Sequence, residues 1–142
     1  MRWGTLLLFW LAALPVAAHK SSDSYLILRP ESAVVHGQWD IALRDLELAV
    51  GLDTNGDGEI TWGELRGRHG AVAAHALSRL ALNAGGAPCA LRATAHLVDY
   101  HSDGAYAVLR FEADCAEPVR ELTVRYGLLF DLDPQHRGLL RL

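Results

Sequence analysis

Oxygen-bearing side chains recur at alternate positions in one short acidic segment, which runs from Asp53 to Glu64. The segment reads Asp53-Thr54-Asn55-Gly56-Asp57-Gly58-Glu59-Ile60-Thr61-Trp62-Gly63-Glu64. Calcium is a hard cation that takes about six to eight oxygen ligands, from carboxylates, amide carbonyls, backbone carbonyls and water. The residue types in this segment therefore predict a calcium site.

The spacing in this segment fits the calcium-binding loop of an EF-hand at every defined position. Gly58 permits the sharp turn that such a loop needs, and Ile60 takes the apolar position that tethers the loop to the core. A surface turn without an ion is the alternative, but a turn has no need of a glutamate at the twelfth position. The predicted ligands are Asp53, Asn55, Asp57, Glu59 through its backbone carbonyl, Thr61 through a water, and Glu64 through both carboxylate oxygens.

Only one such loop occurs in the chain. A lone loop lacks the partner hand that rigidifies a paired site, so we expect a dissociation constant of about 10⁻⁴ to 10⁻⁵ M. Such a site is largely occupied wherever calcium is near millimolar, and the bound ion then stabilises the fold more than it acts as a switch.

The seven histidines raise the alternative of a transition-metal site. His69 and His75 do not share a helical face, and His96 is expected to face Arg110, so none of these three favours a bound cation. After cleavage of a leader, His19 could chelate nickel or copper through its amine and imidazole, with Asp23 nearby.

A second group of metal-ligating residues lies around one predicted turn. Asp99, His101 and Asp103 could meet there, but turn chemistry already explains Asp103. We therefore favour a plain turn over a metal site at this position.

The N-terminal segment has the features of an export signal, with Arg2 followed by an apolar stretch from Thr5 to Leu14. The small residues Val16-Ala17-Ala18 predict cleavage after Ala18, so that residues 1–18 are removed and 19–142 form one exported domain. The apolar run is shorter than the roughly 20 residues that span a bilayer. A periplasmic or secreted location permits a disulfide between Cys89 and Cys115.

Composition excludes several function classes. The chain has 142 residues with 51% apolar and 21% charged, which is typical of a globular domain. The net charge is -4 and the basic residues are scattered, so nucleic acid is not an expected partner. No nucleophile set, phosphate-binding glycine loop or paired-carboxylate site is present at an interpretable spacing, so we do not expect an enzyme.

Hydrophobic periodicity predicts strands over 25–28 and 34–43, a helix from 41 or 42 to 51, a helix over 61–82 and a strand over 122–130. Between the cysteines we predict a hairpin with the three-residue loop Ser102-Asp103-Gly104, which pairs Leu97 with Leu109 and leaves the cysteines diagonal to each other. The predicted fold class is α+β, an antiparallel sheet with one EF-hand helix-loop-helix between its second and third strands.

Five segments together resemble the exported N-terminal region of HupE/UreJ-type membrane proteins, the hydrogenase and urease accessory family. They are His19 to Leu26, Gln38 to Leu46, the loop 53–64, His101 to Tyr106, and Arg125 to Asp131. The resemblance implies a link to nickel handling and several membrane helices further along the chain. Because this sequence stops before such helices, we expect a fragment or a soluble remnant of such a protein.

The leading functional hypothesis is a calcium-stabilised structural or interaction module. One alternative is an extracytoplasmic nickel or copper accessory domain. The other is the N-terminal fragment of a membrane transporter of this type, with a membrane protein or a missing membrane region as its partner.

Overall fold

The computed structural model describes residues 22–142, and the predicted signal peptide and His19 lie outside these residues. The described elements are β1 (Asp23–Glu31), β2 (Val34–Ala42), α1 (Leu43–Val50), α2 (Trp62–Gly67), α3 (His69–Leu77), β3 (Leu80–Ala84), β4 (Ala87–Pro88), β5 (Ala90–His101), β6 (Gly104–Asp114), β7 (Leu122–Tyr126) and β8 (Arg137–Arg141).

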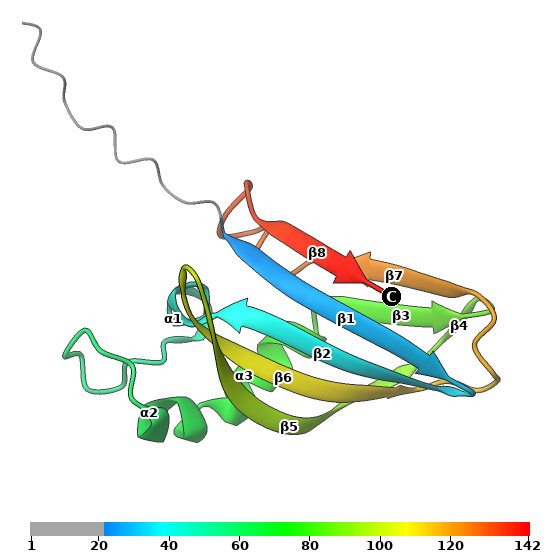
Figure 1. The fold of residues 1–142 in the computed structure, drawn as a ribbon, viewed down its shortest axis with the longest axis horizontal. Helices are drawn as coiled ribbons and strands as arrows, with labels where there is room; N and C mark the ends of the chain where they lie inside the picture. Colours follow the sequence, from blue (N-terminus) through cyan, green and yellow to red (C-terminus); the bar gives the residue numbers. More distant parts are fainter. Residues whose placement is uncertain (1–21) are drawn as a thin grey trace, which may run out of the picture.

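The strands form two sheets. The larger has five strands in the order β5-β6-β2-β1-β8, and the smaller has three in the order β4-β3-β7. All pairs are antiparallel except β1 with β8, which are parallel. The fold is therefore α+β and mostly strand, as predicted, and the three helices gather at one end of the sheets (Figure 1).

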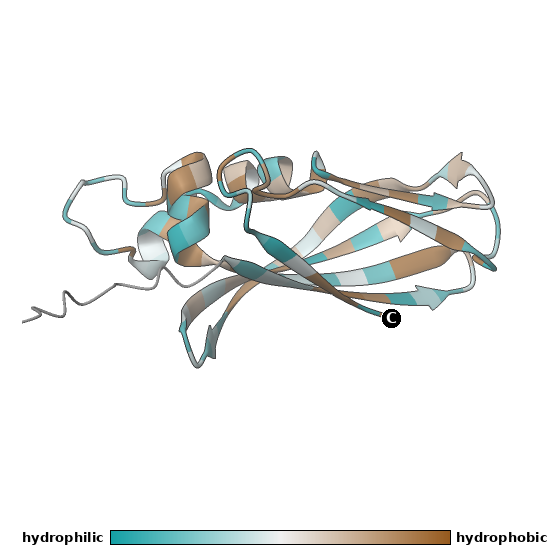
Figure 2. Ribbon diagram, turned by 90° about the horizontal axis from the view of Figure 1, so that it is seen from above, coloured by the Kyte–Doolittle hydropathy of each residue, from teal (hydrophilic) through white to brown (hydrophobic). Residues whose placement is uncertain are grey.

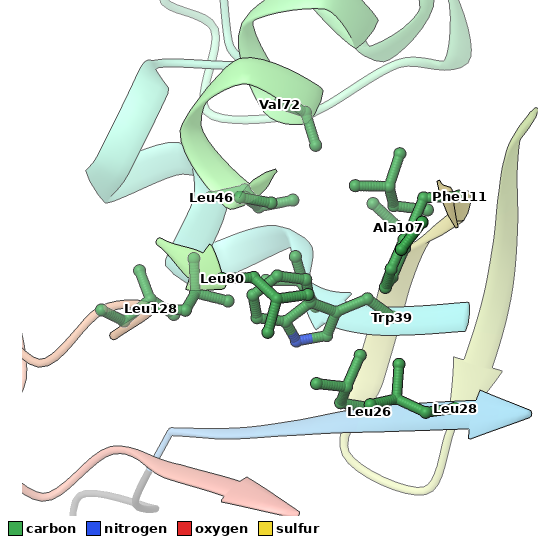
Figure 3. Packing of buried hydrophobic residues seen from close by; sticks show 14 of the residues in the cluster. Leu26, Leu28, Trp39, Leu46, Val72, Leu80, Ala107, Phe111 and Leu128 are labelled. Atoms are coloured by element: carbon green, nitrogen blue, oxygen red, sulfur yellow. The ribbon is translucent and has the colours of Figure 1, made fainter. Parts of the chain in front are cut away.

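A single hydrophobic core lies between the two sheets and is closed at one end by the helices. Trp39 lies at its centre and is fully buried, with Leu26 and Leu28 of β1, Leu80 of β3 and Leu46 of α1 around it (Figure 3). Apolar residues of both sheets and of the helices make up this core, while the loop after α1 projects outward (Figure 2). This core holds both ends of that loop.

The strand predicted over 34–43 is confirmed as β2, and its side chains alternate between a buried and an opposite face. Val35, Trp39 and Ile41 are each fully buried, whereas His36 on the opposite face is exposed. Gly37 belongs to the buried face because the ring of Phe111 on β6 lies directly over it, where a Cβ would come within 2.1 Å. The close approach of this ring explains the glycine in the middle of a central strand.

The helix predicted over 61–82 is wrong in its last five residues, 78–82. The helical segment breaks at Arg68, between Gly67 and Gly70, because glycine is unfavourable inside a helix, and α3 ends at Leu77. Leu80 and Leu82 are buried while Ala81 between them is exposed, and this alternation belongs to β3, which pairs with β7. The partner strand is more than 35 residues away, so the local apolar run did not reveal a strand.

The C-terminal part also departs from the prediction. The strand expected over 122–130 ends at Tyr126, and the chain then turns through Leu129 at a φ of 63°. Beyond that turn, β8 joins the edge of the large sheet beside β1, a parallel pairing that we did not predict. Both Leu128 and Leu129 are buried in the turn, so their apolar character comes from burial and not from strand alternation.

The hairpin of β5 and β6 has a different register from the predicted one. His101 pairs with Gly104, so the turn has two residues, Ser102 and Asp103, and not three. Near the turn Leu97 therefore pairs with Val108, and the predicted pair of Leu97 with Leu109 is wrong. A β-bulge between Ala93 and Ala95 shifts the register once more towards the open end, where Ala93 faces Phe111.

The bulge places the two cysteines opposite each other. Ala90 pairs with Asp114, and continuing this register brings Cys89 against Cys115, with their Cα atoms 4.3 Å apart and the disulfide formed. The predicted disulfide is thus confirmed, whereas the diagonal placement is wrong. Backbone hydrogen bonds from Cys89 N to Leu82 O and from Cys115 N to Ala33 O, each 2.8 Å, tie the base of the hairpin to β3 and to the β1–β2 turn.

A chain of buried and part-buried side-chain hydrogen bonds connects the two ends of the described domain. Trp39 Nε1 donates to Ser24 Oγ (3.2 Å), which lies 2.6 Å from the Tyr126 hydroxyl, and this hydroxyl lies 2.6 Å from His136 Nε2. His136 Nδ1 lies 2.6 Å from Ser22 Oγ, which donates to Asp45 Oδ2 at 2.7 Å.

One arrangement of protons satisfies this whole chain. Because Ser22 gives its proton to the carboxylate of Asp45, His136 donates to Ser22 from Nδ1. A neutral imidazole then accepts at Nε2 from the Tyr126 hydroxyl, and this hydroxyl accepts from Ser24. Burial lowers the pKa of His136, which favours the neutral form, and burial raises the pKa of Tyr126 to about 12, which keeps the Tyr126 hydroxyl a donor. Every member is satisfied, as a buried polar network requires.

Candidate functional site

The acidic loop begins where α1 ends. Gly51 takes a φ of 65° and closes the helix with a hydrogen bond from its N–H to Glu47 O, 2.9 Å long. The side chain of Glu47 then accepts from the backbone N–H groups of Leu52 and Asp53 through Oε2. The fully buried Leu52 anchors this entry in the core.

Arg68 joins the entry of the loop to the helices that follow it. Its guanidinium donates to the carbonyls of Val50 and Gly51, the latter at 2.9 Å. These carbonyls belong to the C-terminal end of α1, where a cation is favoured by the helix dipole. The two ends of the loop are thereby held at a fixed separation.

Inside the loop, carboxylate and amide oxygens turn inward and accept from the backbone. Asp53 accepts from Gly56 N at 2.7 Å and, through its other oxygen, from Gly58 N at 2.8 Å. Asn55 Oδ1 accepts from Asp57 N, and Asp57 Oδ1 accepts from Glu59 N, both at 2.9 Å. The backbone therefore winds around Asp53, the first predicted ligand.

Gly56 and Gly58 allow this winding. Their φ values are 75° and 86°, and nothing lies within 4 Å of the position of a Cβ at either residue. The requirement for glycine is therefore one of backbone conformation and not of space.

The exit of the loop is an N-terminal capping box on α2. Thr61 Oγ1 accepts from Glu64 N, while Glu64 Oε2 accepts from Thr61 N at 2.9 Å and from Thr61 Oγ1 at 2.8 Å. Glu64 Oε1 reaches back to the start of the loop and accepts from Thr54 N at 3.0 Å and Asn55 N at 3.3 Å. Both oxygens of Glu64 thus face the loop.

These hydrogen bonds, first those from Thr61 and then those from Thr54, lower the pKa of Glu64 to about 2. The carboxylate is therefore ionised at any physiological pH. Together with Asp53, Asp57 and Glu59 it gives the segment 53–64 four carboxylates and no basic side chain. The electrostatic field of this loop favours a cation.

The structure nevertheless does not gather the predicted carboxylate ligands tightly. Within the described residues, the only set of three aspartate, glutamate, histidine or cysteine groups with ligand atoms within 4.8 Å of one another is Asp40, Asp99 and His101. The oxygens of Asp53, Asp57 and Glu64 are engaged instead with backbone N–H groups of the loop. A cation that enters the loop must displace some of these bonds.

The Asp40, Asp99 and His101 set differs from the group considered from the sequence, in which Asp103 stood in the place of Asp40. Asp103 accepts instead from the Tyr106 hydroxyl at 2.9 Å and pairs with Arg44 at 3.5 Å. Asp40 lies on β2, which is separated from β5 by β6 in the sheet. Because the strand order alone brings Asp40 near Asp99 and His101, their spacing in the sequence did not indicate this set.

The other histidines are placed apart from this set. His96 pairs with Leu109 and not with Arg110, contrary to expectation, and its ring stacks on that of His69 with centroids 4.2 Å apart. Stacked imidazoles have their nitrogen lone pairs in parallel planes, so the two rings do not chelate one ion. Burial lowers the pKa of both histidines, which keeps the pair neutral.

Comparisons with protein-family models, with curated proteins and with solved structures find no match for this chain. Within residues 22–142, no helix has the length and apolar character needed to cross a membrane. The assignment of a function therefore depends on the chemistry of the described residues.

Proposed function

We propose that the protein is an exported domain that binds one calcium ion in the loop 53–64, with a structural or interaction role and no enzymatic activity. The observation that carries this proposal is the arrangement of Asp53, Asn55, Asp57 and Glu64, whose oxygens all face the backbone of one loop between two helices. The donor set consists of oxygens alone, which suits a hard cation.

Six residues would hold the ion. The side chains of Asp53, Asn55 and Asp57 supply three groups, Glu59 a backbone carbonyl, and Glu64 a carboxylate that already reaches from α2 to the first residues of the loop. Thr61 would bind through a water, and it also positions Glu64 through the capping box. A bound calcium would neutralise part of the charge of the four carboxylates and replace some of the bonds that Asp53, Asp57 and Glu64 make to the backbone.

Export is supported by the disulfide, which is compatible with an oxidising compartment. Extracellular calcium is near millimolar, and a site with the affinity expected for a lone loop is then mostly occupied. In that compartment calcium serves to hold α1 and α2 to the end of the sheets. The resemblance to the exported region of HupE/UreJ-type membrane proteins is a second proposal, and the gene sequence beyond Leu142 tests it directly.

Isothermal titration of the chelator-treated protein with calcium tests the main proposal. We expect one equivalent to bind with a dissociation constant of about 10⁻⁴ to 10⁻⁵ M, and Glu64→Gln to weaken it at least about tenfold. Glu59→Gln is the matched control, because it removes the same charge from the same loop but spares the backbone carbonyl that acts as ligand. Its affinity should stay within about threefold of the wild type.

Nickel and copper serve as competitors in the same titration. Tight binding of either ion with no heat from calcium would refute the calcium site and favour a nickel or copper accessory domain. Equal losses of calcium affinity in Glu64→Gln and Glu59→Gln would show a diffuse charge effect in place of a coordinated ion. Submicromolar affinity would contradict the structural role and indicate a sensor.

A further inference from the structure

The set of Asp40, Asp99 and His101 lies on the face of the large sheet that points away from the core. Trp39 and Ile41 are buried in the core, so Asp40 between them faces the opposite side. Asp99 and His101 are two residues apart on β5 and share a face, and the β5–β6 hairpin bends its tip towards the end of β2 (Figure 1). The set is thus distinct from the loop 53–64.

The distance between His101 and Asp40 suits two ligands of one transition-metal ion, and Asp99 lies close to both residues. His101 Nε2 and Asp40 Oδ2 are 3.2 Å apart, and one ligand atom from each of the three residues lies within 4.8 Å of the other two. Two ligand atoms bound to one zinc ion at about 2.0 to 2.2 Å are separated by about 2.8 to 3.1 Å in octahedral and about 3.3 to 3.6 Å in tetrahedral coordination, an interval of about 2.8 to 3.6 Å in all. The observed separation falls inside that interval.

The carboxylate of Asp40 is fixed in orientation, as the carboxylates that bind metal ions usually are. Its side chain is only 8% exposed, and its Oδ1 accepts from Gln38 Nε2 at 3.0 Å, which leaves Oδ2 directed at His101. Hydrogen bonds of this kind fix the orientation of a ligating carboxylate. A buried carboxylate also needs a compensating charge, and in residues 22–142 its only ion-pair partner is His101.

The imidazole of His101 is fixed in the same way. Its ring stacks on Tyr106 with centroids 4.1 Å apart and lies 5.0 Å from the ring of Tyr25. These two rings leave Nε2 directed at Asp40, so no rearrangement of the ring is needed for it to bind an ion. Asp99 is exposed and accepts from Tyr100 N through Oδ1 at 2.8 Å, which leaves its second oxygen available.

We propose that Asp40, Asp99 and His101 bind one divalent transition-metal ion, with zinc as the representative ion. One imidazole and two carboxylates form a borderline ligand set that suits zinc better than calcium, which prefers oxygen alone. Three protein ligands leave further coordination positions for water. A simple ion pair of His101 with Asp40 is the competing explanation, and it gives no role to Asp99.

His36 offers an internal control for this proposal. It also lies between two carboxylates, those of Glu31 and Glu112, each at 3.5 Å, and it lies on an exposed part of the same sheet. Its side chain is 47% exposed, and the three groups do not converge within 4.8 Å. A general attraction of zinc to histidine beside carboxylates would involve this group equally.

The test is a zinc titration of the chelator-treated protein by calorimetry, supported by the visible absorption of cobalt(II) bound in place of zinc. We expect one equivalent of zinc, an affinity at least about tenfold lower in Asp99→Asn, and no saturable binding in His101→Gln. His36→Gln should bind as the wild type does. Asp99 is exposed, so Asp99→Asn is expected to fold. Its zinc affinity therefore tests the proposed site even if His101→Gln does not fold.

Glu64→Gln separates this site from the calcium loop. It should leave zinc affinity unchanged, while Asp99→Asn should leave calcium affinity unchanged, so each proposal can fail without the other. Zinc affinity that is the same in Asp99→Asn as in the wild type would overturn the proposal and leave His101 and Asp40 as a plain ion pair. Equal weakening in His36→Gln, or no stoichiometric zinc binding at all, would overturn it as well.

Discussion

Replacing Tyr126 by phenylalanine breaks the buried chain of hydrogen bonds at its middle. The variant keeps the ring, which packs 5.4 Å from Trp39, and removes only the hydroxyl that bonds Ser24 and His136. Each lost hydrogen bond costs about 1 kcal/mol, and His136, only 4% exposed, is left with an unpaired Nε2 that adds about 1 kcal/mol. We expect the free energy of unfolding to fall by about 2 to 3 kcal/mol.

Equilibrium unfolding in urea at pH 7.5, followed by tryptophan fluorescence, measures this loss as a lower midpoint at an unchanged m-value. Tyr100→Phe is the matched control, because Tyr100 is 78% exposed and its loss of a hydroxyl should change stability by less than about 0.5 kcal/mol. If Tyr126→Phe is as stable as Tyr100→Phe, then the chain from Trp39 to Asp45 does not hold the ends of the domain together.

Three further perturbations follow from the structure. Burial lowers the pKa of four histidines, His69, His75, His96 and His136. The unfolded chain therefore binds protons more readily than the folded one, so stability should be full above the ordinary histidine pKa of 6.5 and fall as the pH drops below it. Melting temperatures measured from pH 8 to pH 5 test this, and a flat profile would contradict it. Gly37→Ala forces a methyl group into the Phe111 ring and should lower the free energy of unfolding, measured in urea, by about 1 to 3 kcal/mol. Gly67→Ala places its methyl group in open space on α2 and should not destabilise the protein. Reducing the disulfide between Cys89 and Cys115 should lower the free energy of unfolding by about 3 kcal/mol. An unchanged melting temperature in reductant would show that the backbone hydrogen bonds hold the base of the hairpin without the disulfide.

The calcium loop is the part of the candidate site that local sequence predicts best. Its ligands lie within one segment, and the turn residues Gly56 and Gly58, the cap residue Thr61 and Glu64 act on neighbours a few residues away. Such contacts follow from backbone geometry alone. The loop conformation therefore agrees with the pattern, while the binding of calcium stays a prediction for titration.

Contacts between distant segments were not predictable in the same way. The register of β5 against β6 depends on a bulge at Thr94, and a pattern of alternating residues does not show where an extra residue is inserted. The strand β3 looked helical because its partner β7 lies far along the chain. The set of Asp40, Asp99 and His101 likewise needs the strand order β5-β6-β2 before its members can meet.

The amino-acid sequence by itself determined the acidic loop, the capping of the helix after it, the buried face of β2 and the identity of the disulfide pair. Each of these depends on residue types at short spacing, or on there being only two cysteines. Tertiary structure alone decided the hairpin register, the parallel docking of β8 on β1 and the buried chain from Trp39 to Asp45. The physical reason is that side-chain periodicity tells which face of an element is buried, whereas the neighbour across that face is chosen by packing of the whole core.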